Sequence, residues 1–486
     1  MADSANCKNI TSTSHPYRPL MWFGVAILAA LIVAHLPISG LPHDAQITLA
    51  LFVFMVILWI FEVLPVGLAA VLWAMLLVVI IGGKTVPAKV AFGGFTKSTV
   101  WLIMGAFLLG QATVKTGVAE RIAYHTMRLG GSSYTKVLIF LWIAATILGV
   151  LTPSGTVRVS MFIPIMGGIL AAYGASTNSR FAANLLMHVY WGSILGSTLW
   201  YTGSNINPTA MGNLESVIGY SPSFAVWFVW QIFPCLVMAA GSFVLIQLVL
   251  PPEKEIIAHA GSITAIDEKL KEMGPMTTAE KKALAFFALA VVLWITEPFH
   301  GIDTAWVAIL VGILLFLPGV GVLGEKAIKN ISWDTILLLG IALGIDGIMK
   351  AVRLDTWLTK SLLSPILDPL ISIGPIGLAL GITLFVFVVH FLIASAAATT
   401  AILSPLLVQY AHLKGVSVTL AAMVAARSAM NVFIFPYQTT MFIILWGTGY
   451  MNMKQCLRGF GIMAVWQLIW ICLMAPYWDW IMNVIR

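Results

Sequence analysis

A short polar stretch, Thr152–Arg158, separates two long apolar runs with small hydroxyl residues, a proline, a glycine and a full charge. A backbone that is not helical is costly in hydrocarbon unless it is buried in protein or lines a watery cavity. A second interruption, Ala394–Thr400, has its serine, Ser395, 241 residues after Ser154, and in both copies a proline stands ten residues after the serine. The repetition marks the two interruptions as candidate parts of one binding site.

Polar residues gather at these interruptions and at two further expected helix breaks, 201–208 and 433–440. Hydroxyls, amides and backbone N–H groups bind carboxylate oxygens without adding charge, and a broken helix presents free N–H groups to anions. We therefore expect an anionic substrate. Apart from an arginine considered next, the expected substrate-binding residues are Ser154, Gly155, Thr156, Thr202, Asn205, Asn207, Ser395, Ala396, Ala397, Thr399, Pro436, Gln438 and Thr439.

Two arginines, Arg158 and Arg427, fall within the expected membrane region. A buried arginine is expensive in a bilayer and needs an anionic partner, either a protein carboxylate or the substrate. Few acids are available there, the plausible ones being Glu62, Glu297 and Asp346. We expect Arg158 to contact the substrate, the alternatives being a salt bridge or the capping of backbone carbonyls. For Arg427 the structural alternatives are favoured.

The composition places these residues in a polytopic membrane protein. The chain has 486 residues, of which 60% are hydrophobic and 9% charged. Several segments exceed the roughly 20 apolar residues that cross a bilayer. The net charge of +7 comes from lysines and arginines scattered through short loops, with no basic stripe of interleaved aromatics, so no nucleic-acid partner is expected.

The absence of several sequence motifs excludes other classes of activity. The four cysteines lack metal-ligand spacing, and no phosphate-binding loop of an ATP-driven pump is present. No zinc-protease motif and no paired acids at catalytic spacing occur, so an enzyme is poorly supported. No cofactor is expected, apart from the question of a coupling sodium ion. Integral membrane localisation is expected, with a bacterial inner or plasma membrane as the setting and lipid as a partner.

The expected organisation follows from the alternation of apolar runs and loops. It comprises an N-terminal tail (1–19), a first transmembrane helix (20–41), a first repeat (45–252) with its hairpin tip at 152–158, a cytoplasmic linker (253–282), and a second repeat (283–486) with its tip at 394–400.

Internal duplication supports this division. Leu58–Glu62 recurs as Leu293–Glu297 at an offset of 235, and Gly105 and Gly340 share that offset. We predict an all-α polytopic membrane protein of two inverted repeats. About 11 transmembrane helices, two re-entrant hairpins and broken helices at the bilayer midplane complete the predicted fold. Inverted repeats with interrupted helices are typical of secondary active transporters.

The chain resembles the divalent anion:sodium symporter family, which includes sodium-coupled dicarboxylate and citrate carriers and the citrate and 2-oxoglutarate/malate exchangers. The resemblance covers about residue 45 to the end. It rests on the repeated Leu-Trp-Ile-x-Glu motif, the two hairpin tips and the segment Pro436-Tyr437-Gln438. It implies a di- or tricarboxylate substrate, a homodimer, and an elevator movement of the hairpin-bearing unit against a fixed scaffold.

The chain departs from the family at both tips. The family marks each tip with Ser-Asn-Thr, whose side chains touch substrate and help to bind sodium, whereas here the tips read Ser154-Gly155-Thr156 and Ser395-Ala396-Ala397. Loss of both asparagines puts sodium sites in doubt. The first tip, followed by Arg158, looks like the exchanger branch, in which a fixed guanidinium would replace the charge of sodium. We therefore expect sodium-independent exchange.

Three alternatives remain open from the sequence. A sodium-coupled dicarboxylate symporter would bind the ion through backbone carbonyls near Gly196 and Ala426. An inorganic-anion permease of similar fold would share the repeats and hairpins. A channel would need a continuous polar pathway, whereas the polar residues here concentrate at the two tips.

Overall fold

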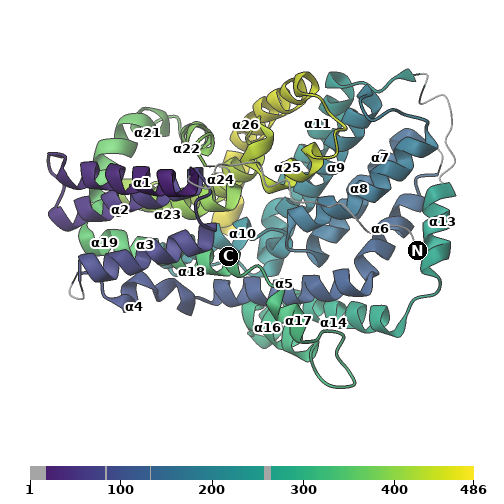
Figure 1. Ribbon diagram of the computed structural model, residues 1–486, viewed down its shortest axis with the longest axis horizontal. Coiled ribbons are helices and arrows are strands. Elements are labelled where there is room, and N and C mark those ends of the chain that lie inside the picture. Colours follow the sequence, from purple (N-terminus) through teal and green to yellow (C-terminus); the bar gives the residue numbers. More distant parts are fainter. Residues whose placement is uncertain are drawn as a thin grey trace.

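The computed structural model describes residues 18–82, 85–131, 133–254, 256, 264–393 and 395–485, which form helices without a β-strand (Figure 1). Most of the expected tail 1–19, position 394 of the second tip and much of 255–263 in the expected linker lie outside the described residues. The elements of the first half are α1 (Arg18–His35), α2 (His43–Ile60), α3 (Val66–Ile80), α4 (Ala88–Ala91), η1 (Gly93–Thr96), α5 (Ser98–Thr116), α6 (Val118–Arg128), α7 (Tyr134–Leu151), α8 (Gly155–Ala172), α9 (Arg180–Leu199), η2 (Tyr201–Gly203), α10 (Ile206–Ile218) and α11 (Phe224–Val249).

The second half repeats this order after a short connecting helix. The connecting helix is α13 (Thr264–Met273). The elements of the second half are α14 (Thr278–Ile295), α15 (Glu297–His300), α16 (Thr304–Leu314), α17 (Glu325–Lys329), α18 (Trp333–Ala342), α19 (Ile345–Val352), α20 (Leu354–Leu358), η3 (Thr359–Leu363), α21 (Ser364–Ile371), α22 (Pro375–His390), α23 (Ala396–Lys414), α24 (Val418–Asn431), η4 (Pro436–Gln438), α25 (Thr440–Trp446) and α26 (Met453–Val484).

Equivalent helices of the two halves pack against each other in crossed pairs. At the offset of 235, α18 corresponds to α5 and α16 corresponds to α3, and in the structure α5 packs against α16 while α18 packs against α3. Around the hairpins, α10 packs against α23 and α25 packs against α8. Such crossed pairs are what two repeats related by a twofold axis produce. The domain boundaries themselves stay a prediction.

Apolar helices long enough to cross a bilayer are present, as expected of a polytopic membrane protein. Among the described residues, six helices qualify by length and hydropathy, and α5 with α6 qualifies as a pair bent by 68°. Two of the six, α7 and α8, are the limbs of the first hairpin. Because α1, α3, α16 and α22 are shorter than one full span, the expected count of about eleven spans stays a prediction.

The first helix is shorter than the expected 20–41. It ends at His35, because Pro37 disfavours the helical conformation at Leu36 and cannot donate a backbone hydrogen bond itself.

The described part of the linker is held against the helices. Arg121 of α6 donates from Nε to Glu280 Oε1 at 2.7 Å and from Nη1 to the carbonyl oxygen of Gly274 at 2.8 Å. The bond to Arg121 outweighs burial and lowers the pKa of the Glu280 carboxyl. Since α13 also packs against α6, the connection between the halves is partly a docked helix.

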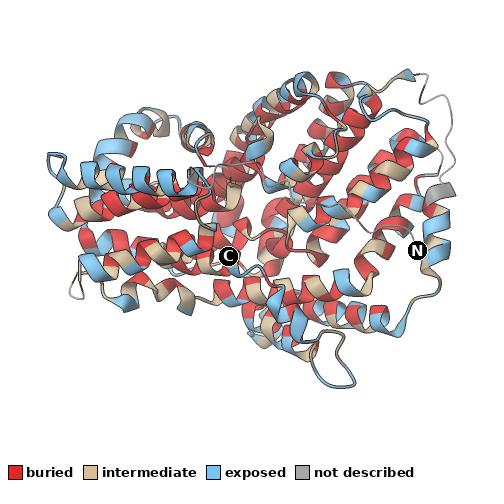
Figure 2. Ribbon diagram, in the orientation of Figure 1, coloured by how far each residue is buried: buried red, intermediate tan, exposed pale blue. Residues whose placement is uncertain are grey.

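Burial is greatest where the interrupted helices meet (Figure 2). In α24 every residue from Thr419 to Asn431 is buried, and in α9 every residue from Phe181 to Leu199 is buried except Leu195. A helix enclosed on all sides is fixed by its neighbours. These two helices therefore provide rigid supports for the chain breaks that follow them.

A glycine contact fixes the distance between α5 and α16. A Cβ added at Gly105 would stand 2.5 Å from the backbone carbonyl carbon of Ala308, whereas a Cβ at Gly24 would meet nothing within 4 Å. We predict that Gly105→Ala destabilises the protein by about 1–3 kcal/mol through overpacking. Gly24→Ala should leave thermal unfolding in detergent unchanged or slightly raised; equal effects of the two substitutions would contradict the proposed close packing.

Candidate anion-binding site

Both hairpin tips reach one cavity of about 360 Å³. Among the described residues that line it there is no lysine, arginine or histidine, and Asp334 is the one carboxylate. Apolar residues from several helices complete its wall. The polar lining residues are Ser154, Thr156, Tyr190, Ser197, Ser204, Asn205, Ser332, Asp334, Thr335, Ser395, Thr439 and Thr440.

The two tip serines start the two helices that leave the tips. Ser154 Oγ accepts from the backbone N–H of Val157 at 3.4 Å, and Ser395 Oγ accepts from that of Ala398 at 3.3 Å. Serine is a preferred N-cap because its short hydroxyl satisfies one of the free N–H groups of the first turn. Both tips therefore present the beginning of a helix, α8 or α23, to the cavity.

The two helix breaks bring further helix beginnings to the same cavity. Ser204 Oγ accepts from the N–H of Ile206 at 3.3 Å, where α10 begins. Thr439 Oγ1 accepts from the N–H of Phe442 at 3.2 Å, where the short α25 begins. A helix beginning carries a partial positive charge and free N–H groups, so it favours anions. Four such ends can stabilise a dianion without a cationic side chain.

The structure brings together eight of the fourteen residues expected from the sequence. The eight that line the cavity are Ser154, Gly155, Thr156, Asn205, Ser395, Ala396, Ala397 and Thr439. The other six do not line the cavity, and they are Arg158, Thr202, Asn207, Thr399, Pro436 and Gln438.

Arg158 does not occupy the expected position against the substrate. Its side chain is fully buried and points back from the first turn of α8 into the break after α9. Its donors meet the carbonyl oxygens of Thr152 at 2.8 Å, Ser193 at 3.1 Å and Gly203 at 3.3 Å, as well as Ser197 Oγ. The contacts correspond to the alternative of carbonyl capping. The carbonyls of Thr152 and Gly203 lie where helices are interrupted, and that of Ser193 lies within α9.

Asn207 and Arg427 support the same break from the other side. Asn207 Nδ2 donates to the carbonyl oxygens of Ser197 at 2.8 Å and Trp200 at 2.9 Å. Its Oδ1 accepts from Arg427 of α24, whose guanidinium also lies 5.4 Å from the centre of the Trp227 ring. The two arginines are thus structural supports of one interruption, one from each half of the chain.

The remaining expected residues lie at the second tip, at the second break and, for Thr202, at the first break. Thr399 Oγ1 lies 2.8 Å from His390 Nδ1 at the base of the second tip. Gln438 Oε1 accepts from the backbone N–H groups of Ile434 and Phe435 at 2.9 and 2.8 Å and closes the turn that Pro436 begins. Thr202 is buried in η2 of the first break. These side chains position the cavity wall.

The start of α18 contributes cavity residues that the sequence reasoning missed. Ser332, Asp334 and Thr335 line the cavity, and Asp334 Oδ1 accepts from the N–H of Gly67 at 2.7 Å. The sequence contained a pointer to these residues. They come shortly before Gly340, which is the repeat equivalent of Gly105 in α5. Tyr190 was also missed; its hydroxyl lies 3.3 Å from Thr439 Oγ1.

The two positions named for a backbone sodium site lie away from the cavity. Gly196 lies where α7 and α9 approach most closely, since a Cβ there would meet the carbonyl oxygen of Ala145. Ala426 is fully buried in α24. The nearby carbonyl oxygens of Ser193 and Gly203 already accept from Arg158.

Removing Arg158 should unpair several buried carbonyls at once. We predict that Arg158→Ala lowers stability by at least about 3 kcal/mol, because each buried polar group left unpaired costs about 1–3 kcal/mol. The control is Arg180→Ala, whose exposed ion pair with Glu253 spans 3.6 Å and contributes about 1 kcal/mol or less. Thermal unfolding in detergent distinguishes the two; similar small losses would mean that Arg158 does not hold the break.

Comparison with known proteins places the fold and the site in context. The family model described as the sodium:sulfate symporter transmembrane region matches residues 19–484. The chain is 26% identical to dicarboxylate transporter 1, chloroplastic, of Spinacia oleracea, covering 95% of this chain and 81% of that protein. It is 27% identical to the putative malate transporter YflS of Bacillus subtilis strain 168, covering 70% of this chain and 72% of that protein.

A bacterial membrane protein and a solved structure are also similar. The inner membrane protein YbhI of Escherichia coli strain K12 is 25% identical, over 90% of this chain and 92% of that protein. The crystal structure of the Alcanivorax borkumensis YdaH transporter superposes with a TM-score of 0.54, at 13% identity, over 95% of this chain and 98% of that chain. The latter likeness concerns the fold alone. With the family model matching nearly the whole chain, this protein is an integral membrane transporter, not an enzyme, and belongs to the divalent anion:sodium symporter family.

Proposed function

We propose that this protein is a secondary active exchanger of small dicarboxylates. The observation that carries the proposal is the convergence of α8, α10, α23 and α25 beginnings on one cavity of about 360 Å³. The two tips come from different halves, so each can face one carboxylate of a substrate. The names of the chloroplast transporter and of YflS, which specify dicarboxylate and malate transport, support the same substrate class.

Sodium independence is supported by the environment of Arg158. Carbonyl and hydroxyl oxygens are the ligands that hard cations take in proteins. Here such a group, formed by Thr152, Ser193, Ser197 and Gly203, surrounds a guanidinium. The guanidinium supplies a permanent positive charge behind the first tip without touching the substrate. A bound sodium ion would be redundant at this place.

We predict that malate loaded inside proteoliposomes stimulates uptake of labelled malate at least roughly tenfold, as expected when the return of the empty carrier is the slow step. Replacing external sodium by choline should leave this uptake unchanged. Vesicles without internal malate are the control. Uptake into those vesicles driven by a sodium gradient would instead establish the symporter, and uptake of sulfate in place of malate would favour an inorganic-anion permease.

Asp334, the one carboxylate among the described residues that line the cavity, supports dicarboxylates over citrate. Asp334 Oδ1 is occupied by the N–H of Gly67, so the negative charge is fixed at the cavity wall. A third carboxylate of the substrate would be repelled by it, by on the order of 1 kcal/mol or more at an effective dielectric constant of about 20.

Removing this charge should therefore relax selectivity. We predict that Asp334→Asn, which keeps an oxygen for Gly67, raises the ratio of citrate to malate exchange at least roughly fivefold. Thr335→Ser changes the same wall without changing its charge and should leave the ratio as it is. Counterflow with both labelled anions measures the ratio, and an unchanged ratio in Asp334→Asn would remove Asp334 from the selectivity mechanism.

Transport would require a movement of the interrupted elements against the other helices. The pairs α3 with α18 and α5 with α16 form one packed group, while the tips and breaks pack against each other across the cavity. This division supports the elevator movement in a homodimer that the family resemblance implies. Cross-linking of paired cysteines across the boundary in vesicles would test the movement, since a locked unit should stop exchange.

A further inference from the structure

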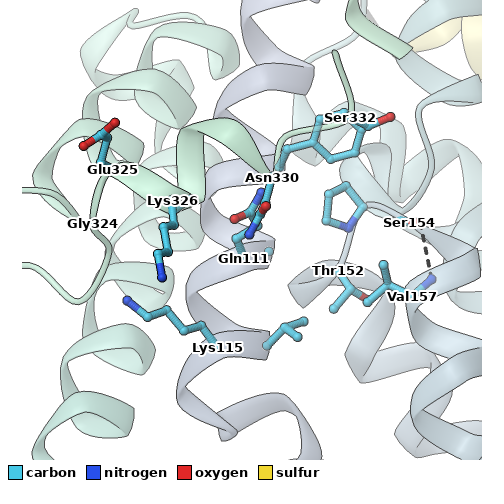
Figure 3. Close-up of a pocket in the computed structure, with 15 residues that line it drawn as sticks. Gln111, Lys115, Thr152, Ser154, Val157, Gly324, Glu325, Lys326, Asn330 and Ser332 are labelled. Atoms are coloured by element: carbon cyan, nitrogen blue, oxygen red, sulfur yellow. Dashed lines mark hydrogen bonds between the residues drawn. The ribbon is translucent and has the colours of Figure 1, made fainter. Parts of the chain in front are cut away.

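A second and larger cavity, of about 790 Å³, adjoins the central one. It lies between α5, the segment around α17, and the first tip, and it shares Phe107, Pro153, Ser154 and Ser332 with the central cavity (Figure 3). The shared residues make it an antechamber to the tips. Its wall is otherwise mostly apolar, which limits the number of groups that can hold an ion there.

Two lysines stand at the outer end of this antechamber. Lys115 lies in the last turn of α5 and donates from Nζ to the carbonyl oxygen of Val322 at 2.9 Å, and Lys326 belongs to α17. Both are exposed, and in Figure 3 both side chains extend toward the same region of the cavity. In the described part of the chain, neither forms an ion pair.

Among the described residues that line the antechamber, the acidic one, Glu325, has a basic partner outside it. Glu325 Oε1 lies 2.7 Å from Lys329 Nζ, one turn along α17. The antechamber therefore keeps the positive charge of Lys115 and Lys326. Further in, Gln111 and Asn330 place neutral amides between the lysines and Ser154 (Figure 3). The antechamber is therefore positively charged at its outer end and lined by neutral hydrogen-bonding groups nearer the first tip.

The antechamber opens on the side of the molecule that carries the linker. The chain passes from α5 through Gly117 into α6, and α6 packs against α13. Lys282, at the start of α14, donates to the carbonyl oxygen of Gly319 in the loop before α17. Substrate that approaches from the linker side therefore meets Lys115 and Lys326 before it meets Ser154.

We propose that this antechamber is a transient binding site for small dianions, in which Lys115 and Lys326 capture the substrate and pass it to the first tip. The proposal rests on the dicarboxylate transport proposed above. It follows from a contrast in charge, because the described residues that line the central cavity include Asp334 and no basic side chain, and helix ends act over short distances. The charge of Arg158 behind the first tip is fully buried, whereas Lys115 and Lys326 are exposed where an anion would arrive, and charges in a cleft raise local anion concentration.

Sided exchange measurements test this role. In proteoliposomes of known orientation, Lys115→Gln/Lys326→Gln should raise the KM for malate on the linker side roughly three- to tenfold at low ionic strength. The maximal rate and the KM on the opposite side should not change. The difference should shrink at high salt, where screening acts within about 3–10 Å. Lys281→Gln removes another exposed lysine on the same side, outside the antechamber, and serves as the control.

A second measurement does not depend on transport. In a chain whose cysteines have been replaced, Asn330→Cys places a thiol in the antechamber, and its modification rates by anionic and cationic methanethiosulfonates report the local potential. The anionic reagent should be favoured, and adding the double lysine substitution should lower that preference at least roughly threefold. The capture role of Lys115 and Lys326 would be wrong if the double substitution left the preference for the anionic reagent unchanged, or left the KM unchanged in a protein that exchanges malate. Absence of malate exchange with the preference intact would instead contradict the proposed function.

Discussion

The structure depends on how backbone N–H and carbonyl groups find hydrogen-bond partners where helices are interrupted. In hydrocarbon a free N–H or carbonyl has no water to bond, so each interruption must find partners in the protein or in a ligand. In this protein the free carbonyls and the free N–H groups are satisfied in different ways. Carbonyls at and after the end of α9, those of Ser197, Trp200 and Gly203, accept from Arg158 or Asn207, whereas first-turn N–H groups of α8, α10, α23 and α25 have no helical acceptor. The asymmetry leaves a surplus of donors around the cavity, which suits an anion.

The same constraint explains how arginines can be tolerated in so apolar a chain. Arg158 and Arg427 are fully buried, yet neither meets a carboxylate among the described residues. Carbonyl and amide oxygens stabilise them instead. The guanidinium of Arg158 also lies beside the cavity, since it donates to Ser197, which lines it. A positive charge there raises the electrostatic potential in the cavity without contact, since Coulomb interactions decline slowly in a medium of low dielectric constant.

Much of the architecture could be predicted from the sequence because it depends on local signals. Apolar runs, the serine-proline spacing of the tips and the recurrence of Leu58–Glu62 anticipated the all-α fold and the placement of Ser154 and Ser395 at one cavity. The direction of Arg158 was not predictable in the same way, because it is decided by carbonyls 35 and 45 residues away. Asp334 was missed for a similar reason. Its place in the cavity depends on the packing of α18 against α3, a long-range contact between halves.

The crossed packing of the halves limits how each of them can change. At the first tip, α8 packs against α25, and a Cβ at Gly155 would collide with Met441. At the second tip, α23 packs against α10. Each half therefore supplies part of the wall around the other's tip. A substitution at either tip therefore has to fit a wall that the other half of the chain supplies, so the two halves cannot be altered independently at this cavity.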